Sequence, residues 1–318
     1  KSMLPMSTPR TLSFLAIVAA AALAACSKTA DAPPPAADPP AAEAAIAPTS
    51  PNVKSFTIGE LSALSLRDGA MEIPNDNKVF GVGLTPEEVV AVLATAGQPT
   101  DKLALSIQPL LVKAKDRVLL FDTGAASLFG PGTGLLLASF TEAGVDPQTV
   151  TDIFISHSHG DHVGGLLNSQ GALTFPNATI HLSLPEWNHL KGQEHFATLV
   201  TAMTPKVDAF TPGAELVSGT VKAVDIKGHT PGHSGYLITS GAQSLLYVGD
   251  SMHHFVVSVQ KPEWTIAYDG DSPTAAKSRA DLIAASAASG QRIYAVHFPF
   301  PGIGKFEKQG EGFAWVAE

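Results

Sequence analysis

One six-residue segment constrains the fold and chemistry of this chain more than any other feature. It reads His157-Ser158-His159-Gly160-Asp161-His162 and follows an apolar stretch, Asp152 to Ser156, that predicts a short buried strand. Divalent metals such as zinc bind imidazole nitrogen and carboxylate oxygen, and ligands on one tight loop lose little chain entropy on binding. The alternative, a polar surface loop, would crowd several imidazoles beside a buried strand. The segment therefore predicts a metal site at the end of a strand.

Three later positions add candidate ligands, and each follows a predicted strand or turn. They are His229, in Gly228 to Ser234, Asp250, after Val248-Gly249, and His297, after Tyr294-Ala295-Val296. A single histidine after a strand is more often structural than a ligand, so none of the three is informative alone. Together with the first segment they give seven side chains, which suffice for two metals with open coordination positions. Open positions are typical of catalytic rather than structural sites.

The pattern of apolar residues after Ser55 indicates an α/β protein built in layers, with its site on loops at one edge of the sheets. A hairpin is predicted from Ser106 to Phe121, with its turn at Lys115-Asp116-Arg117. Further strands are predicted at 152–156, 179–182, 221–226, 235–239, 244–248 and 293–296, and helices at 134–143, from Pro185 onward and at 272–288.

The N-terminal region predicts export. Residues 12–25 form an apolar run too short to span a bilayer, preceded by Arg10 and ending in Leu23-Ala24-Ala25-Cys26. This pattern resembles a bacterial lipoprotein signal, although a buried N-terminal helix is the alternative. We expect residues 1–25 to be a signal peptide, Cys26 to carry lipid, and the Ala/Pro-rich segment up to residue 52 to be a tether. Residues 53–318 would then form one domain, lipid-anchored in the bacterial periplasm at the outer membrane.

Charge and cysteine content exclude several classes of function. Lys and Arg number 20 against 29 Asp and Glu, a net charge of −9, which argues against a nucleic-acid partner. Cys26 is the only cysteine in the chain. The fold therefore has no internal disulfide, and its chemistry uses neither a cysteine nucleophile nor a cysteine metal ligand.

The ordered motifs together resemble the metallo-β-lactamase fold superfamily. The resemblance implies a four-layer αβ/βα sandwich with two metals in the groove between its sheets. It assigns His157, His159 and His229 to one metal and Asp161, His162 and His297 to the other. Asp250 would bridge both, and we expect Asp122 and His233 to orient the ligands. The metals would be two divalent ions, zinc or else manganese, iron or cobalt, holding a bridging hydroxide as nucleophile with Asp161 and Asp250 as the catalytic carboxylates.

Within this superfamily, the chain from Ser55 onward looks most like methyl parathion hydrolase and related aryl-lactonases. The matching segments are Leu120 to Ala126 with Leu128 to Pro131, Phe175 to Ala178, and Phe300 to Gly304. The resemblance implies a homodimer and places Phe129 and Trp187 in the substrate pocket, with core packing as the alternative for each, and Phe196 in a lid.

Residues 251–254 are more polar than the organophosphate hydrolase has at this place, which weakens the expectation of phosphotriesterase activity. His253 is a candidate substrate contact. We favour a solvent-facing position for it, because adjacent residues on a strand point to opposite faces.

These arguments predict a dinuclear hydrolase of lactones or aryl esters with promiscuous phosphotriesterase activity, acting on a small-molecule substrate. The first alternative is cleavage of acyl-homoserine lactones, for which long acyl chains would need an apolar channel. Hydrolysis of β-lactams is a weaker alternative. Some zinc β-lactamases use a cysteine metal ligand, which this chain lacks outside Cys26, and the others generally lack a bridging carboxylate like that of Asp250. A lipid-tethered periplasmic zinc-binding protein without turnover is the alternative outside the enzymes.

Overall fold

The computed structural model describes residues 50–318. The expected signal peptide, the lipidated Cys26 and nearly all of the expected tether lie outside the described residues. Within residues 50–318, no helix is both long and apolar enough to cross a membrane.

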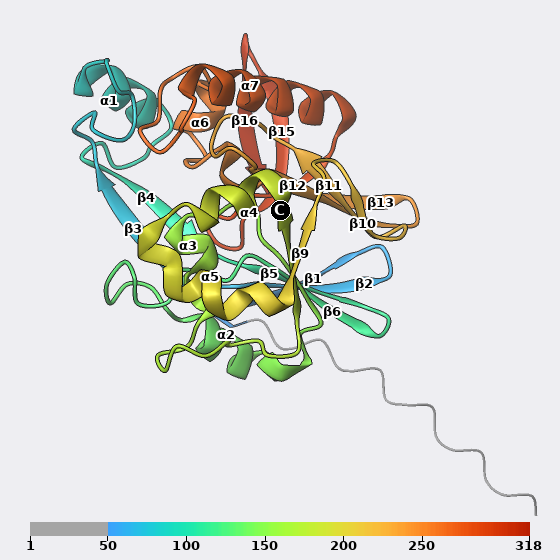
Figure 1. Cartoon of the computed structure of the whole chain (residues 1–318). Coiled ribbons are helices and arrows are strands. Elements are labelled where there is room, and N and C mark those ends of the chain that lie inside the picture. The colour runs from blue at the N-terminus through green and yellow to red at the C-terminus, as the bar shows by residue number, and fades with distance from the viewer. Residues whose placement is uncertain (1–49) are drawn as a thin grey trace, which may run out of the picture. The chain divides into compact units, whose positions relative to one another are not determined.

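Two sheets of seven strands face each other in the described domain (Figure 1). Strands β6 to β9 run parallel in the first sheet, and in the second only β13 and β14 are parallel neighbours. The first sheet has, in spatial order, β1 (Val53–Ile58), β2 (Leu61–Leu66), β5 (Leu110–Ala114), β6 (Arg117–Phe121), β7 (Asp152–Phe154), β8 (Thr179–Ser183) and β9 (Val207–Phe210). The second has β10 (Glu215–Val217), β11 (Val221–Asp225), β12 (Ser234–Ser240), β13 (Gln243–Tyr247), β14 (Arg292–Tyr294), β15 (Ile303–Gln309) and β16 (Gly312–Ala317).

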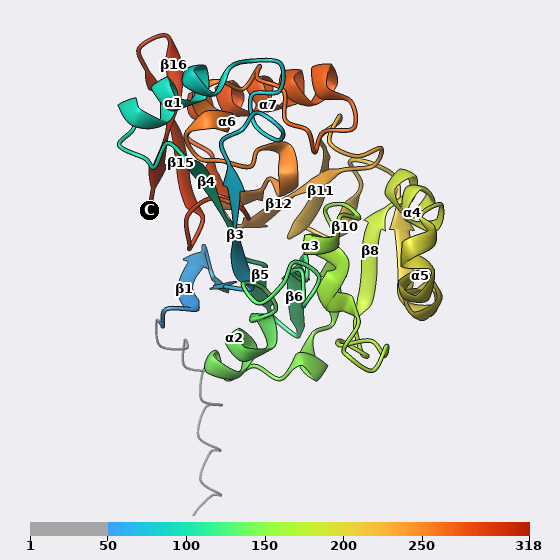
Figure 2. The same cartoon turned by 90° about the vertical axis from the view of Figure 1, so that its left-hand side faces the viewer.

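Helices cover the outer face of each sheet. Those beside the first sheet are α2 (Leu136–Glu142), α3 (Gly160–Val163), α4 (Leu184–Lys191) and α5 (Ala197–Met203). Those beside the second are α6 (Val257–Gln260) and α7 (Ser272–Ser289), and Figure 2 shows α7 lying along that side of the domain. This arrangement confirms the expected αβ/βα sandwich.

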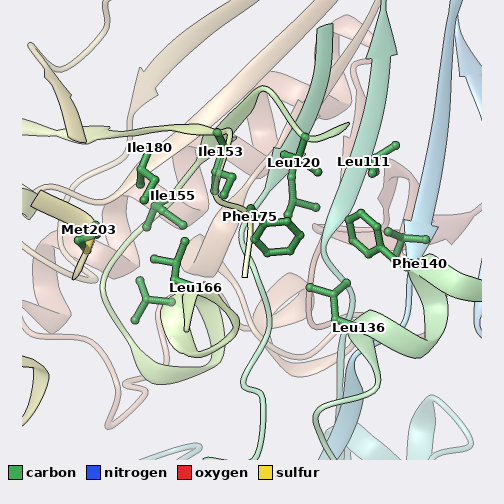
Figure 3. Close-up of a cluster of buried hydrophobic side chains, with 14 of the residues drawn as sticks. Leu111, Leu120, Leu136, Phe140, Ile153, Ile155, Leu166, Phe175, Ile180 and Met203 are labelled. Carbon is green, nitrogen blue, oxygen red and sulfur yellow. The ribbon is translucent and has the colours of Figure 1, made fainter. Parts of the chain in front are cut away.

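Each interface between layers has its own apolar core. Between the sheets, Phe121 and Phe154 stack at 4.9 Å between ring centroids and contact Tyr236 of β12. Between the first sheet and its helices, Leu120, Ile153 and Ile180 pack against side chains of α2 and α5, as Figure 3 shows. Because both faces of β6 and β7 are buried, these strands read as continuous apolar runs rather than alternating ones.

The predicted hairpin from Ser106 to Phe121 is wrong at its start. The hairpin proper is β5–β6, with Ala114 opposite Arg117. Ser106 belongs instead to β4 (Lys102–Ile107), which pairs with β3 (Gly69–Pro74) in a separate two-stranded sheet. Pro109 separates β4 from β5, because proline has no N–H to donate to a strand ladder.

We call residues 69–107 the arm, because β3, β4 and the helix α1 (Pro86–Thr95) between them leave the first sheet and lie beside α6 (Figure 2). A capping box at Thr85 and Glu88 starts α1. Apolar side chains of the arm, among them Phe80 and Leu105, pack on Val257 and Ile266. The arm is therefore held against the segment that follows Asp250.

Candidate metal centre

The segment 157–162 leaves the end of β7 and begins α3, and Asp122 fixes its start. The Asp122 carboxylate accepts hydrogen bonds from the backbone N–H of Ser156, at 2.7 Å, and from its hydroxyl, at 2.6 Å. On the facing sheet, Gly249 has φ +53°, and a Cβ there would lie 2.5 Å from Nε2 of His233. Only glycine fits at that position, directly before Asp250.

The structure brings all seven candidate ligands together in two groups. His157, His159, His229 and Asp250 form one group, Asp161, His162, Asp250 and His297 form the other, and the ligand atoms of each group lie within 4.8 Å of one another. Asp250 belongs to both: its Oδ2 lies 3.5 Å from Nε2 of His157, and its Oδ1 lies 3.2 Å from Nε2 of His162. The grouping is the one that the resemblance implies, with Asp250 shared by both groups.

Hydrogen-bond partners behind three of the histidines fix which ring nitrogen faces the centre. Nδ1 of His297 donates to the carbonyl of Ser106 at 2.7 Å. Nδ1 of His162 lies 2.7 Å from Asp122, and Nδ1 of His229 lies 2.9 Å from Asp269. A proton held on Nδ1 leaves the lone pair of Nε2 for the centre, and this arrangement is typical of metal-ligating histidines.

The atoms at the centre fit a divalent cation. Nε2 of His162 and Oδ1 of Asp250 are buried, and neither makes a hydrogen bond within residues 50–318. Nε2 of His229 lies 3.1 Å from both Nε2 of His157 and Nδ1 of His159, where the three lone pairs repel unless a cation or proton lies between them. Imidazole nitrogen and carboxylate oxygen together are a donor set for zinc and similar metals.

The charges of the site support the same conclusion. Burial lowers the pKa of His297, but the Asp250 and Asp161 carboxylates outweigh it and raise that pKa to about 10. Burial, together with the neighbouring His229, lowers the pKa of His159 to about 4. Positive charge is therefore strongly favoured beside the carboxylates. Asp250 and Asp269 likewise raise the pKa of His229 against the effect of burial, whereas His157 and His159 present neutral imidazole, the form that coordinates metals.

Sequence reasoning missed Glu186, which ties two ligand loops together. Its buried carboxylate accepts hydrogen bonds from the backbone N–H of Ser158 at 2.7 Å, the hydroxyl of Thr230 at 2.8 Å and the N–H of Gly232 at 2.9 Å. It thus joins the segment 157–162 to the loop that carries His229. A glutamate in the first turn of a predicted helix is indistinguishable from a surface residue in sequence.

Asp269 also escaped sequence reasoning, because nothing around it resembles a ligand motif. Asp122 and His233 lie where they were expected to orient ligands. Asp122 contacts His162, and Nε2 of His233 accepts the backbone N–H of Asp250 at 2.9 Å.

One cavity adjoins the centre, and a second shares Phe129 and Gly160 with it. The first, of about 380 Å³, contains candidate ligands in its floor. Its walls comprise Met71, Leu105, Phe129, His253, Ala267 and Tyr268. The second is larger, about 960 Å³, and mostly apolar, with Leu128, Leu137, Phe196 and Leu199 among its lining residues.

The structure corrects two expectations about the pocket. His253 does not face solvent: it is 1% exposed, and its Nε2 lies 3.2 Å from Oδ2 of Asp250. The strand-alternation argument fails because residues 249–251 form a tight turn, after which the chain is not in a strand. Trp187 is 8% exposed and packs in the core between the first sheet and its helices, outside both cavities. Phe129 and Phe196 do line cavities.

The sequence profile of the metallo-beta-lactamase superfamily matches residues 105–297, more than half of the chain. A hydroxyacylglutathione hydrolase of Shewanella baltica (strain OS195) is 29% identical over 122 residues, which are 38% of this chain. The match spans only 40% of the length of that relative.

Two solved structures are similar over most of the domain. The dizinc quorum-quenching lactonase AidC, solved with an N-acyl homoserine product, has a TM-score of 0.79 and 29% identity, covering 84% of this chain and 97% of its own. The hydrolase AbOPH of the beta-lactamase superfamily has a TM-score of 0.77 and 28% identity, covering 85% of this chain and 99% of its own.

Proposed function

This chain belongs to the metallo-beta-lactamase superfamily, and we propose that it is a dinuclear metal-dependent hydrolase acting on lactones and aryl esters, with phosphotriesters as secondary substrates. The observation that carries the proposal is the position of Asp250, whose two oxygens face two separate ligand groups beside an open cavity. A purely storage or structural site would not need a carboxylate shared between two ions next to a substrate-sized cavity.

The ligand groups would hold two divalent ions, of which zinc suits the donor set best. When bound, such a pair supplies an activated water and polarises the carbonyl or phosphoryl oxygen of the substrate. Asp250 keeps the two groups at a fixed separation, since it contacts both. Asp161, with Oδ2 3.3 Å from Nε2 of His297, lines the first cavity and would hold the second ion beside the substrate.

The walls of the first cavity suit a flat, partly polar substrate. Phe129 and Leu105 offer apolar surface for an aryl or short acyl group. His253 and Tyr268, with ring centroids 5.7 Å apart, place hydrogen-bonding groups on the opposite wall. Such groups can stabilise the charge that develops on the leaving oxygen of a lactone or ester, and His253 belongs to the segment 251–254 that is more polar than in the organophosphate hydrolase. The polar wall therefore supports lactone over phosphotriester hydrolysis, within the resemblance to aryl-lactonases and methyl parathion hydrolase.

A second candidate is the cleavage of N-acyl homoserine lactones. The observation in its favour is the large apolar cavity, which meets the first at Phe129 and Gly160 and has room for a long acyl chain. AidC, similar in fold, is a quorum-quenching lactonase. The two candidates share one reaction and differ in the group beside the lactone ring.

One experiment tests both candidates. The metal-loaded protein is assayed on an aryl lactone, a long-chain N-acyl homoserine lactone, a methyl phosphotriester and a β-lactam, each with and without a chelator. We expect chelator-sensitive turnover and a kcat/KM for one of the lactones more than about a hundredfold above that for the phosphotriester, about 2.7 kcal/mol in transition-state binding. A phosphotriester or β-lactam preference would contradict the lactonase proposal.

Asp250→Ala provides the matched loss-of-function variant. We expect it to bind fewer metal ions and to lose kcat by at least about a hundredfold while staying folded. Full activity in this variant would show that Asp250 does not bridge two ions. Metal binding without hydrolysis of any substrate would favour a zinc-binding protein.

We further propose that the protein acts as a lipid-anchored periplasmic enzyme and as a homodimer. The support for the anchor is the sequence around Cys26 alone. Incorporation of labelled palmitate that is lost in Cys26→Ser tests the anchor, and the mass of the protein in solution tests the dimer.

A further inference from the structure

Two buried charged residues lie in contact with each other behind the metal centre. Arg279 of α7 is 0% exposed, and Asp269 is 8% exposed. We propose that they form a positioning pair, in which Arg279 holds Asp269 and Asp269 sets the metal affinity of the ligand group that contains His229. This inference rests on the dinuclear centre of the proposed function, and on no particular substrate.

The contacts form a chain from helix α7 to the centre. Oδ1 of Asp269 accepts the hydrogen bond from Nδ1 of His229 at 2.9 Å. Its other oxygen, Oδ2, lies 3.3 and 3.4 Å from the two terminal nitrogens of Arg279. Each oxygen of Asp269 therefore has its own partner, so the carboxylate cannot rotate without losing one of them.

Arg279 also contacts the loops on either side of Asp269. Nη1 donates to the carbonyl of Ser251 at 3.1 Å, and Nε donates to the carbonyl of Pro262 at 3.0 Å. Ser251 directly follows Asp250, and Pro262 begins the segment that ends at Tyr268 in the cavity wall. The rigid guanidinium fork thus joins the chain at Ser251, Pro262 and Asp269.

Burying the guanidinium of Arg279 costs free energy, which its contacts must offset. Taking a guanidinium out of water is costly unless its donors are satisfied, and helix α7 has no other fully buried charge. A carboxylate behind a ligating imidazole fixes its tautomer and increases its basicity, and loss of such a partner typically lowers metal affinity 10- to 100-fold.

The other ligand group is supported differently. Asp122 contacts His162 in the way that Asp269 contacts His229. The other hydrogen bonds to Asp122 come from neutral donors, which are the backbone N–H and hydroxyl of Ser156 and the hydroxyl of Tyr247. In the described part of the chain, no arginine or lysine makes an ion pair with Asp122. The two groups thus have separate supports, so loss of one support should weaken one ion more than the other.

The test uses the full-length protein and zinc alone, with zinc affinities measured by competition with a chelator. For Asp269→Asn we expect one of the two zinc affinities to fall 10- to 100-fold while the other stays within about threefold. Asp122→Asn should weaken the other zinc instead. Arg279→Lys, which keeps the charge and loses the fork, should weaken the same zinc as Asp269→Asn, by a smaller factor.

Two controls separate positioning from general destabilisation. Asp281→Asn makes the same chemical change on the exposed face of α7, where Asp281 pairs with Lys277, and should alter neither affinity. Trp187→Ala lowers stability from a core position outside both cavities, and should also leave both affinities unchanged. Unchanged affinities in Asp269→Asn, or an equal fall of both, would overturn the proposal. Because the experiment measures zinc affinity, its outcome does not depend on whether any tested substrate is hydrolysed.

Discussion

The imidazole rings of His253 and His297 lie nearly parallel, with planes 9° apart and centroids 5.7 Å apart. His297 is a candidate metal ligand whose own orientation is fixed by the carbonyl of Ser106. The stack places the ring of His253 at the boundary between the metal centre and the first cavity. A titratable ring in this position contacts both the ligands and whatever enters the cavity.

His253→Leu should therefore change substrate preference. Leucine keeps most of the volume and removes both nitrogens, so we expect kcat/KM for an aryl lactone to fall about tenfold, while kcat/KM for a methyl phosphotriester stays constant or rises. Steady-state kinetics on both substrates, at verified equal metal content, checks this. An equal fall for both substrates would mean that His253 supports the centre itself rather than selecting substrates.

Trp187→Ala should act on stability instead of specificity. The side chain is buried in the core with Leu190 and Leu199, and removal of a buried tryptophan typically costs about 3–5 kcal/mol. Urea unfolding measures this loss, and Trp187→Phe should show a smaller one. If stability is unchanged and the ratio of kcat/KM values between substrates changes, Trp187 contacts the substrate and the core assignment is wrong.

Phe129→Ala should lower activity and leave stability nearly unchanged. Phe129 is 48% exposed and lies between the two cavities, so the change in the free energy of unfolding should stay within about 0.5 kcal/mol. We expect kcat/KM to fall for both short and long-chain lactones. Leu128→Ala is the matched comparison, because Leu128 lines the larger cavity but not the smaller, and should affect long-chain substrates only. Identical effects of the two variants would contradict a substrate path across both cavities.

His254 should make stability depend on pH. Burial lowers its pKa to about 4, and its Nδ1 accepts the backbone N–H groups of Val256 and Val257 at 3.3 Å. The unfolded chain takes up a proton near pH 6.5 and the folded one near pH 4, so protonation favours unfolding between these values. The contribution of His254 to the free energy of unfolding should be constant above about pH 7, fall as the pH drops, and level off below about pH 4, with a total change on the order of 3 kcal/mol.

His254→Asn supplies the comparison for this prediction. Asparagine can still accept a backbone N–H but does not titrate. The difference in unfolding free energy between the two proteins should shrink from pH 7.5 to pH 4.5, since the titrating ligands are common to both. A difference independent of pH would show that His254 is not held neutral by burial.

Much of the candidate ligand set could be predicted from sequence because its chemistry is local. His157 to His162 are neighbours in the chain, and the later candidates follow predicted strands or turns, whereas their division between two metals came from the resemblance to the metallo-β-lactamase superfamily. Asp269 and Glu186 could not be predicted, since their roles depend on loops that meet only in the folded domain. His253 was misplaced because strand alternation was applied to a segment that turns at Gly249. The start of the hairpin was predicted wrongly, because the residues of β4 favour a strand but pair with β3 rather than β5.

The arm has a consequence for how the first cavity can change in evolution. Met71 and Leu105 face each other across β3 and β4, and both line the first cavity. The next residue along β4, Ser106, holds His297 through its carbonyl. Leu105 is therefore next to the residue whose carbonyl orients a candidate ligand, whereas Met71 lies on the neighbouring strand. Changes of substrate range should therefore arise more readily at Met71 of β3 than at Leu105 of β4, because the end of β4 also orients His297.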